Sequence, residues 1–164
     1  MKSVKLSMMF FLTILVYVVF HITEECLGNF PVFMSQNWGI PNIGYARWLY
    51  HNIIFFLPVL LLAFLIFLTN ENKFFSFGLG ISFWGVLNFL EHAFYSIKNS
   101  NISPGFYSSL LFLLITLVTL YIAKNKKVLT KKRVVLSIGL SLAYWSISLI
   151  LVMLLAGKVA LIFS

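Results

Sequence analysis

LSMMFFLTILVYVVFHITEECL, residues 6–27, is the stretch that decides the fold of this chain. Residues 6–20 carry no charge, and the run is long enough for the ~20 residues that a helix needs to cross a bilayer. It follows two lysines as a signal peptide would, but it ends in His-Ile-Thr-Glu-Glu-Cys and lacks the small residues of a cleavage site. We therefore expect a retained membrane helix here.

Composition extends this expectation to the whole chain. The 164 residues are 61% hydrophobic and 10% charged, with a mean hydropathy of +0.99. A soluble domain of this size needs more polar side chains to cover its surface. Further apolar runs lie at about 49–68, 74–97, 106–123 and 134–155. The sequence predicts an all-α, polytopic membrane helix bundle of about five transmembrane helices, a single integral membrane domain over residues 1–164.

The connector between the first two runs has a different character. Residues 28–50 contain Pro31, Gly39, Pro41 and Gly44, which are too closely spaced for a spanning helix. The same stretch is rich in Trp and Tyr, as at a headgroup boundary. We expect an interfacial or re-entrant segment, because irregular backbone at membrane depth must be covered by protein or face water.

The basic residues predict an orientation. Six of the twelve lie between Lys124 and Arg133. One set of loops carries these six together with Lys2, Lys5 and Lys73, whereas the opposite set carries Arg47, Lys98 and Lys158. The positive-inside rule then puts the N-terminus in the cytoplasm and the C-terminus outside a cell membrane. The net charge of +8 does not indicate nucleic-acid binding, because no soluble domain carries the basic loop.

Polar residues cluster at one end of this predicted bundle. Two of the four acidic residues, Glu24 and Glu25, follow His21 at helical spacing. Asn88, Glu91 and His92 repeat the i, i+3, i+4 pattern in the third apolar run, and His51 begins the second. Ionisable groups cost about 2.5–3.5 kcal/mol each at the centre of a membrane helix. We therefore expect the two polar stripes to face each other near the extracytoplasmic leaflet.

His21-x-x-Glu24-Glu25 at the end of a first membrane helix resembles the signature of the HXXEE family of membrane proteins. Asn88 and His92 are similar to a further asparagine and histidine of that family, and the Asn29–Pro31 connector and Pro104-Gly105 turn fit its layout. The resemblance covers most of the chain. It implies a polytopic membrane protein whose polar residues form an active site, without an established reaction.

Three kinds of function remain open at this point. In the first, a divalent metal (zinc, iron or manganese) is bound by His21, Glu25, Glu91 and His92, with Glu24 as a base and Asn88 as an orienting partner; His51 is an additional candidate. The metal would activate water or oxygen against a lipidic or small amphiphilic substrate. The second is proton transfer without a metal. The third is a proton- or cation-coupled carrier, or a small binding or immunity protein, without catalysis.

Simpler roles account for some of these residues. Glu24, Glu25 and His51 could be solvated at the interface. Glu91 and His92 could make only structural hydrogen bonds between helices. The sequence does not predict the oligomeric state.

Overall fold

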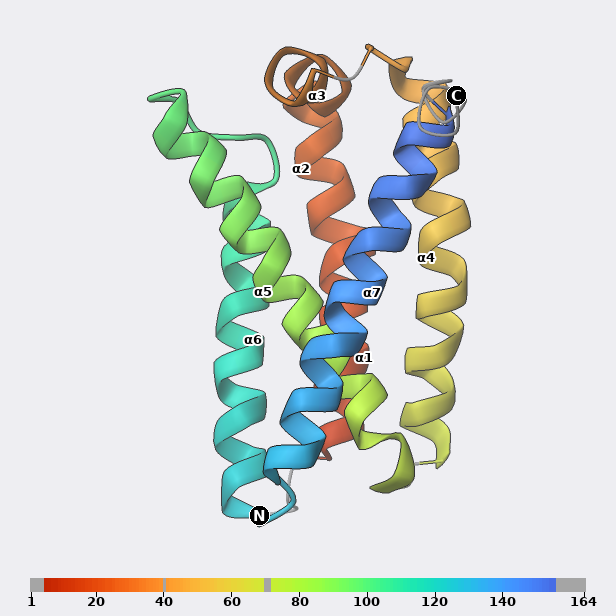
Figure 1. The fold of residues 1–164 in the computed structure, drawn as a ribbon, viewed down its shortest axis with the longest axis vertical. Coiled ribbons are helices and arrows are strands. Elements are labelled where there is room, and N and C mark those ends of the chain that lie inside the picture. The colour runs from red at the N-terminus through yellow and green to blue at the C-terminus, as the bar shows by residue number, and fades with distance from the viewer. Residues whose placement is uncertain (1–4, 40, 70–71, 156–164) are drawn as a thin grey trace.

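The protein is a bundle of helices that run roughly parallel to one another (Figure 1). The computed structural model describes residues 5–39, 41–69 and 72–155, and among these it contains no strand. The first long helix is continuous through α1 (Leu6–Val16), a π-helical segment (Tyr17–His21) and α2 (Ile22–Leu27). The other helices are α3 (Phe30–Trp38), α4 (Gly44–Thr69), α5 (Phe75–Lys98), α6 (Phe106–Asn125) and α7 (Lys131–Leu155).

Among the described residues, four helices are long and apolar enough to cross a membrane. They are Leu6–Leu27, α4, α6 and α7. Their outer faces carry large apolar side chains that no other part of the described chain covers, including Leu61, Leu117 and Ile150. Such faces suit hydrocarbon, because lipid tails are as apolar as these side chains. The prediction of a helical, multi-pass membrane protein is confirmed.

Helix α5 differs from these four because its first half is buried in the bundle. Glycines bring it close to its neighbours: a Cβ on Gly78 would lie 2.1 Å from a ring carbon of Phe10, and one on Gly85 would lie 2.9 Å from Cβ of Phe112. Small residues at such contacts let membrane helices approach closely, and they also lower the hydropathy of α5. Helix α5 runs alongside the other helices over most of their length (Figure 1). It corresponds to the predicted span at 74–97, and its crossing of the membrane stays a prediction.

The connector between the first two long helices is more regular than the sequence suggested. It contains α3, which crosses the end of the bundle (Figure 1). Asn29 precedes α3 with a φ of 56°, and Pro31 lies in its first turn, where a missing backbone N–H leaves no helical hydrogen bond unmade. Helix α4 begins at Gly44, before the expected start near residue 49.

The two ends of the bundle carry different residues. Helix α1 begins at the end where α4 leads to α5 and α6 leads to α7, and the six basic residues of Lys124–Arg133 lie there (Figure 1). The C-terminus of α2, α3 and the α5–α6 turn lie at the other end. This arrangement agrees with the predicted division of the loops, although Lys2 and Lys158 lie outside the described residues.

A candidate metal centre

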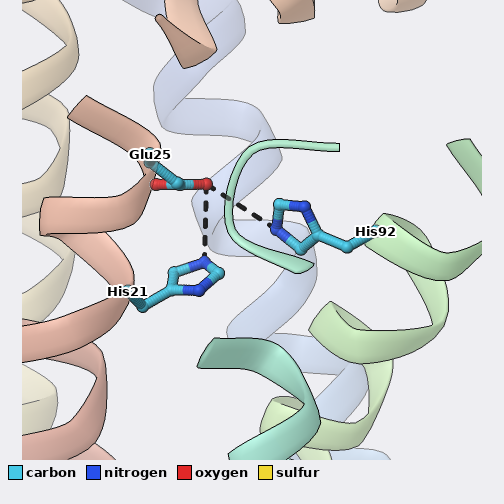
Figure 2. Close-up of side chains that lie close together, drawn as sticks. All are labelled: His21, Glu25 and His92. Carbon is cyan, nitrogen blue, oxygen red and sulfur yellow. Dashed lines mark ion pairs between the residues drawn. The ribbon is translucent and has the colours of Figure 1, made fainter. Parts of the chain in front are cut away.

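The centre of the site is a group of three buried side chains, His21, Glu25 and His92. Nε2 of His21 lies 3.4 Å from Oε1 of Glu25, and Nε2 of His92 lies 3.7 Å from the same oxygen. Figure 2 shows both imidazole rings turned toward the Glu25 carboxylate, with His21 and Glu25 on the first long helix and His92 on α5. One donor atom from each residue lies within 4.8 Å of the other two. The exposed fractions are 0%, 4% and 2%, so water outside the bundle does not reach these groups.

A π-helical segment directs His21 into the bundle. The N–H of Ile22 bonds to the carbonyl of Tyr17, five residues earlier, and this turn therefore holds one residue more than an α-helical turn. One extra residue rotates the following helix by about 100° relative to α1. Helix α2 thus has its own inward face, on which His21 and Glu25 are one turn apart. Single π turns within α-helices often occur at functional sites.

A hydroxyl and a carboxylate fix the orientation of the His21 ring. Nδ1 of His21 lies 2.8 Å from Oγ of Ser108, at the start of α6. The Ser108 hydroxyl donates to Oε2 of Glu24 at 2.5 Å, which is shorter than its 3.2 Å contact with the carbonyl of Gly105. Because a serine has one proton to donate, its oxygen accepts from Nδ1–H of His21. This tautomer leaves the lone pair of Nε2 facing Glu25.

Glu24 itself binds the N-terminus of α6. Its carboxylate accepts the backbone N–H of Tyr107 at 3.0 Å and that of Ser108 at 2.7 Å. These N–H groups have no partner within their own helix, and a negative charge at a helix N-terminus is stabilised by the helix dipole. Glu24 is therefore not one of the three converging residues. It supports His21 through Ser108.

The second histidine is held in a similar way. Nδ1 of His92 lies 2.9 Å from Oγ of Ser103, in the turn between α5 and α6. The backbone N–H of Ser103 in turn donates to Oγ of Ser96, one helical turn beyond His92. The Ser103 hydroxyl has its own acceptor, the carbonyl of Pro104 at 3.4 Å. In the tautomer in which Nδ1–H of His92 donates to Ser103, Nε2 again carries the lone pair.

With these tautomers, three hydrogen-bond acceptors converge without a donor between them. Nε2 of His21 is buried and makes no hydrogen bond with any described residue. Such a group needs a cation at its centre, either a proton or a metal ion, because an unpaired buried polar atom costs about 1–3 kcal/mol. A proton on Glu25 satisfies one histidine at a time, whereas a metal ion satisfies both. Donor atoms around tetrahedral zinc lie about 3.3 Å apart, which is close to the two measured distances.

Gly105 allows the two rings to meet the α5–α6 turn. A Cβ at this position would lie 2.7 Å from Cε1 of His21 and 2.7 Å from Cε1 of His92. The φ angle of Gly105 is +93°, which also favours glycine. Any side chain at residue 105 would therefore push the α5–α6 turn away from the two imidazole rings.

The other predicted residues surround a cavity beside the three-residue group. The cavity has a volume of about 50 Å³, and Glu25, His92, Glu91, Asn88 and His51 all contribute to its lining. Glu91 is outside the converging group; its Oε2 accepts the indole N–H of Trp145 at 3.4 Å. Nε2 of His51 lies 3.0 Å from the carbonyl of Ser148. The cavity has room for a few water molecules.

Sequence reasoning missed Ser103, Ser108 and Gly105 as members of the site. In the sequence, Ser103-Pro104-Gly105 indicates only a turn. Ser108 is the third residue of α6, and a serine near the start of a helix is common. The one available signal was that this turn follows the polar third run at the same end of the bundle as His21.

No family model matches the chain, and no curated protein and no solved structure is significantly similar to it.

Proposed function

We propose that this membrane protein is a metal-dependent enzyme whose site binds one divalent ion through His21, Glu25 and His92. The observation that carries the proposal is the convergence of two imidazole Nε2 atoms on one carboxylate oxygen. Two histidines and one glutamate are a ligand set of catalytic zinc sites, in which the fourth position is left for water or substrate. Zinc is therefore the ion we expect, with iron or manganese as the other metals that such ligands bind.

The surroundings of the three ligands support metal binding as well. Ligating histidines usually donate their other ring N–H to an oxygen, which fixes the tautomer and raises the basicity of the ligand. Ser108 and Ser103 fill this role for His21 and His92 respectively. In the Ser108 case the oxygen is itself hydrogen-bonded to a carboxylate, Glu24. The role proposed for Glu24 is thus to position His21, rather than to act as a base.

A bound metal of this kind supplies Lewis-acid activation of water. Glu91 and Asn88 line the cavity beside the ligands and are the groups available to hold or accept a proton there. The amide oxygen of Asn88 is buried and has no hydrogen-bond partner among the described residues. We propose a hydrolytic reaction on a lipidic or amphiphilic substrate, because the site lies within a bundle whose outer faces suit lipid.

The packing below the site favours an enzyme over a carrier. Between the three-residue group and the basic end, the interior contains apolar clusters that include Ile14, Phe112, Phe10 and Leu79. The buried hydroxyls of Thr13 and Thr116 in this half bond to backbone carbonyls, and no ionisable side chain is buried there among the described residues. A proton or cation carrier needs ionisable groups along both halves of its path. The basic loop is proposed to be cytoplasmic, which places the site in the extracytoplasmic half of a cell membrane. We also propose that the chain is related to the HXXEE family, because His21, Glu24 and Glu25 match the signature of that family.

Metal analysis of detergent-purified protein tests this function. We expect about one zinc per chain in the wild type and in His51→Ala, a matched control because His51 lines the cavity but is outside the ligand group. Glu25→Gln and His92→Ala should lose the metal while they retain their helical circular dichroism. Proteoliposomes with the wild-type protein should release lipid products only when metal is present. A metal-free protein with the same lipid-cleaving activity would overturn the proposal.

A further inference from the structure

The cavity beside the three-residue group has an unusual wall. All four tryptophans of the chain line it, together with Tyr17 and Phe30. The tryptophans come from four different elements: Trp38 from α3, Trp48 from α4, Trp84 from α5 and Trp145 from α7. Trp48 and Trp84 are only 2% and 4% exposed. A membrane-boundary role, which the sequence suggested for Trp38 and Trp48, leaves indole rings at the headgroups, whereas the ring of Trp48 is buried.

The charges around the cavity differ from those of the whole chain. The protein has a net charge of +8, yet no lysine or arginine is among the described residues that line the cavity. Two of the four acidic residues, Glu25 and Glu91, do line it. Glu25 belongs to the ligand group, so a bound metal offsets its charge. The carboxylate of Glu91 is outside the ligand group and is available to another cation. It accepts a hydrogen bond from the indole N–H of Trp145.

Buried polar atoms without partners also lie at this cavity. Nε1 of Trp38, Nδ1 of His51 and Oδ1 of Asn88 make no hydrogen bond, and all three residues line it. His51 is 6% exposed. Buried polar groups are nearly always paired with protein, water or a ligand. These atoms therefore indicate a space that is filled by polar molecules or by the polar part of a ligand.

From these observations we infer that the substrate is an amphiphile with an ammonium headgroup, which binds in the tryptophan-lined cavity beside Glu91. Tryptophan faces attract cations through the ring quadrupole, more strongly where water is excluded, and aromatic cages are a recurring site for quaternary ammonium groups. A phosphate or carboxylate headgroup would find two carboxylates here and no lysine or arginine among the described lining residues. The inference names the substrate class of the proposed enzyme and depends on that proposal for the reaction, but not for binding.

An apolar groove provides a place for the tail of such a molecule. It has a volume of about 370 Å³ and lies between α4 and α7, lined by residues that include Pro58, Tyr144 and Leu151. Phe55 also lines the groove, and its ring is parallel to that of His51 at a centroid distance of 6.3 Å. His51 belongs to the cavity, so Phe55 separates the groove from the cavity. An alkyl chain in the groove reaches the cavity with its headgroup when the ring of Phe55 turns aside.

Tryptophan fluorescence tests the inference directly, because every tryptophan of the chain lines the cavity. The probes are hexyltrimethylammonium and 2,2-dimethyloctane, a neutral molecule of the same shape, compared at equal mole fractions in the detergent micelle. We expect saturable quenching by the ammonium probe alone. Glu91→Gln should weaken its binding about tenfold, and Trp145→Leu should weaken it about 3-fold, since a cation–π contact with a partly exposed ring corresponds to roughly that factor.

Measurements with zinc-loaded and with chelator-treated protein separate this inference from the metal proposal. Glu91 is outside the ligand group, so Glu91→Gln should keep the zinc stoichiometry of the wild type. Ammonium binding without zinc binding would refute the metal centre and leave the headgroup site supported. Equal binding of the two probes, no saturable binding, or an unchanged affinity in Glu91→Gln would overturn the headgroup site whatever the metal content.

Discussion

Replacing Gly105 by alanine should disturb the proposed metal centre although it changes none of the ligand residues. The added Cβ would lie 2.7 Å from Cε1 of both His21 and His92, and 3.0 Å from Nε2 of His92. The positive φ of +93° adds a backbone cost of about 1–2 kcal/mol for a residue with a side chain. Overpacking of a filled interior costs a further ~1–3 kcal/mol. The free energy of unfolding should therefore fall by about 2–5 kcal/mol.

Gly44→Ala is the matched control for this substitution. Gly44 has a φ of +71°, and nothing lies within 4 Å of its Cβ position, so only the backbone cost of about 1–2 kcal/mol applies. Denaturant unfolding in micelles measures both stabilities, and competition with a chromogenic chelator measures zinc affinity. Zinc affinity should fall at least tenfold in Gly105→Ala and stay unchanged in Gly44→Ala. Equal zinc affinity in the two variants would refute the close approach of both rings to the α5–α6 turn.

Three further outcomes follow from the same contacts. Ser108→Ala should lower zinc affinity about 10–100-fold, because it removes the oxygen at Nδ1 of His21. The control is Ser109→Ala, which should leave zinc affinity unchanged, because the Ser109 hydroxyl bonds to the carbonyl of Phe106. Equilibrium dialysis measures both affinities. Acidification should release the metal, because protons compete for the imidazole lone pairs and the carboxylate; zinc retention at pH 4 would contradict this ligand set. In a background without Cys26, Lys126→Cys should be labelled only from the cytoplasm and Gln36→Cys only from outside, and the reverse pattern would invert the proposed orientation.

Several parts of the fold could be predicted from the sequence because they depend on local composition. Helices need long apolar runs to cross a bilayer, and the expected spans at 106–123 and 134–155 correspond to α6 and α7. The short helix α3 could not be predicted, since proline and glycine mark breaks but do not show what lies between them. Its nine residues between Asn29 and Gly39 are helical in the structure.

The candidate site was predictable only in part. Helical spacing places His21 and Glu25 one turn apart, and the structure brings them together with His92. The same spacing grouped Glu24 with them and Glu91 with His92. Adjacent residues on a helix differ by about 100° in direction, so Glu24 reaches the N-terminus of α6 and Glu91 reaches Trp145. Which of two neighbours faces the centre depends on helix rotation, and sequence spacing does not contain that information.

Contacts between segments that are distant in the chain could not be predicted from the sequence. The four tryptophans lie at residues 38, 48, 84 and 145, and nothing in the sequence links the first two, in the connector, to the other two. They share one cavity because α3, α4, α5 and α7 meet at the same end of the bundle. The serines that orient the two imidazoles likewise belong to the α5–α6 turn and the start of α6.

X-ray absorption spectroscopy at the zinc edge tests the metal centre most directly. For protein loaded with one equivalent of zinc, the structure predicts nitrogen and oxygen ligands at about 2.0–2.2 Å, without sulfur. The outer-shell scattering should correspond to two imidazoles. A sulfur ligand from Cys26, or a spectrum without imidazole scattering, would contradict the assignment of His21, Glu25 and His92 as the metal ligands.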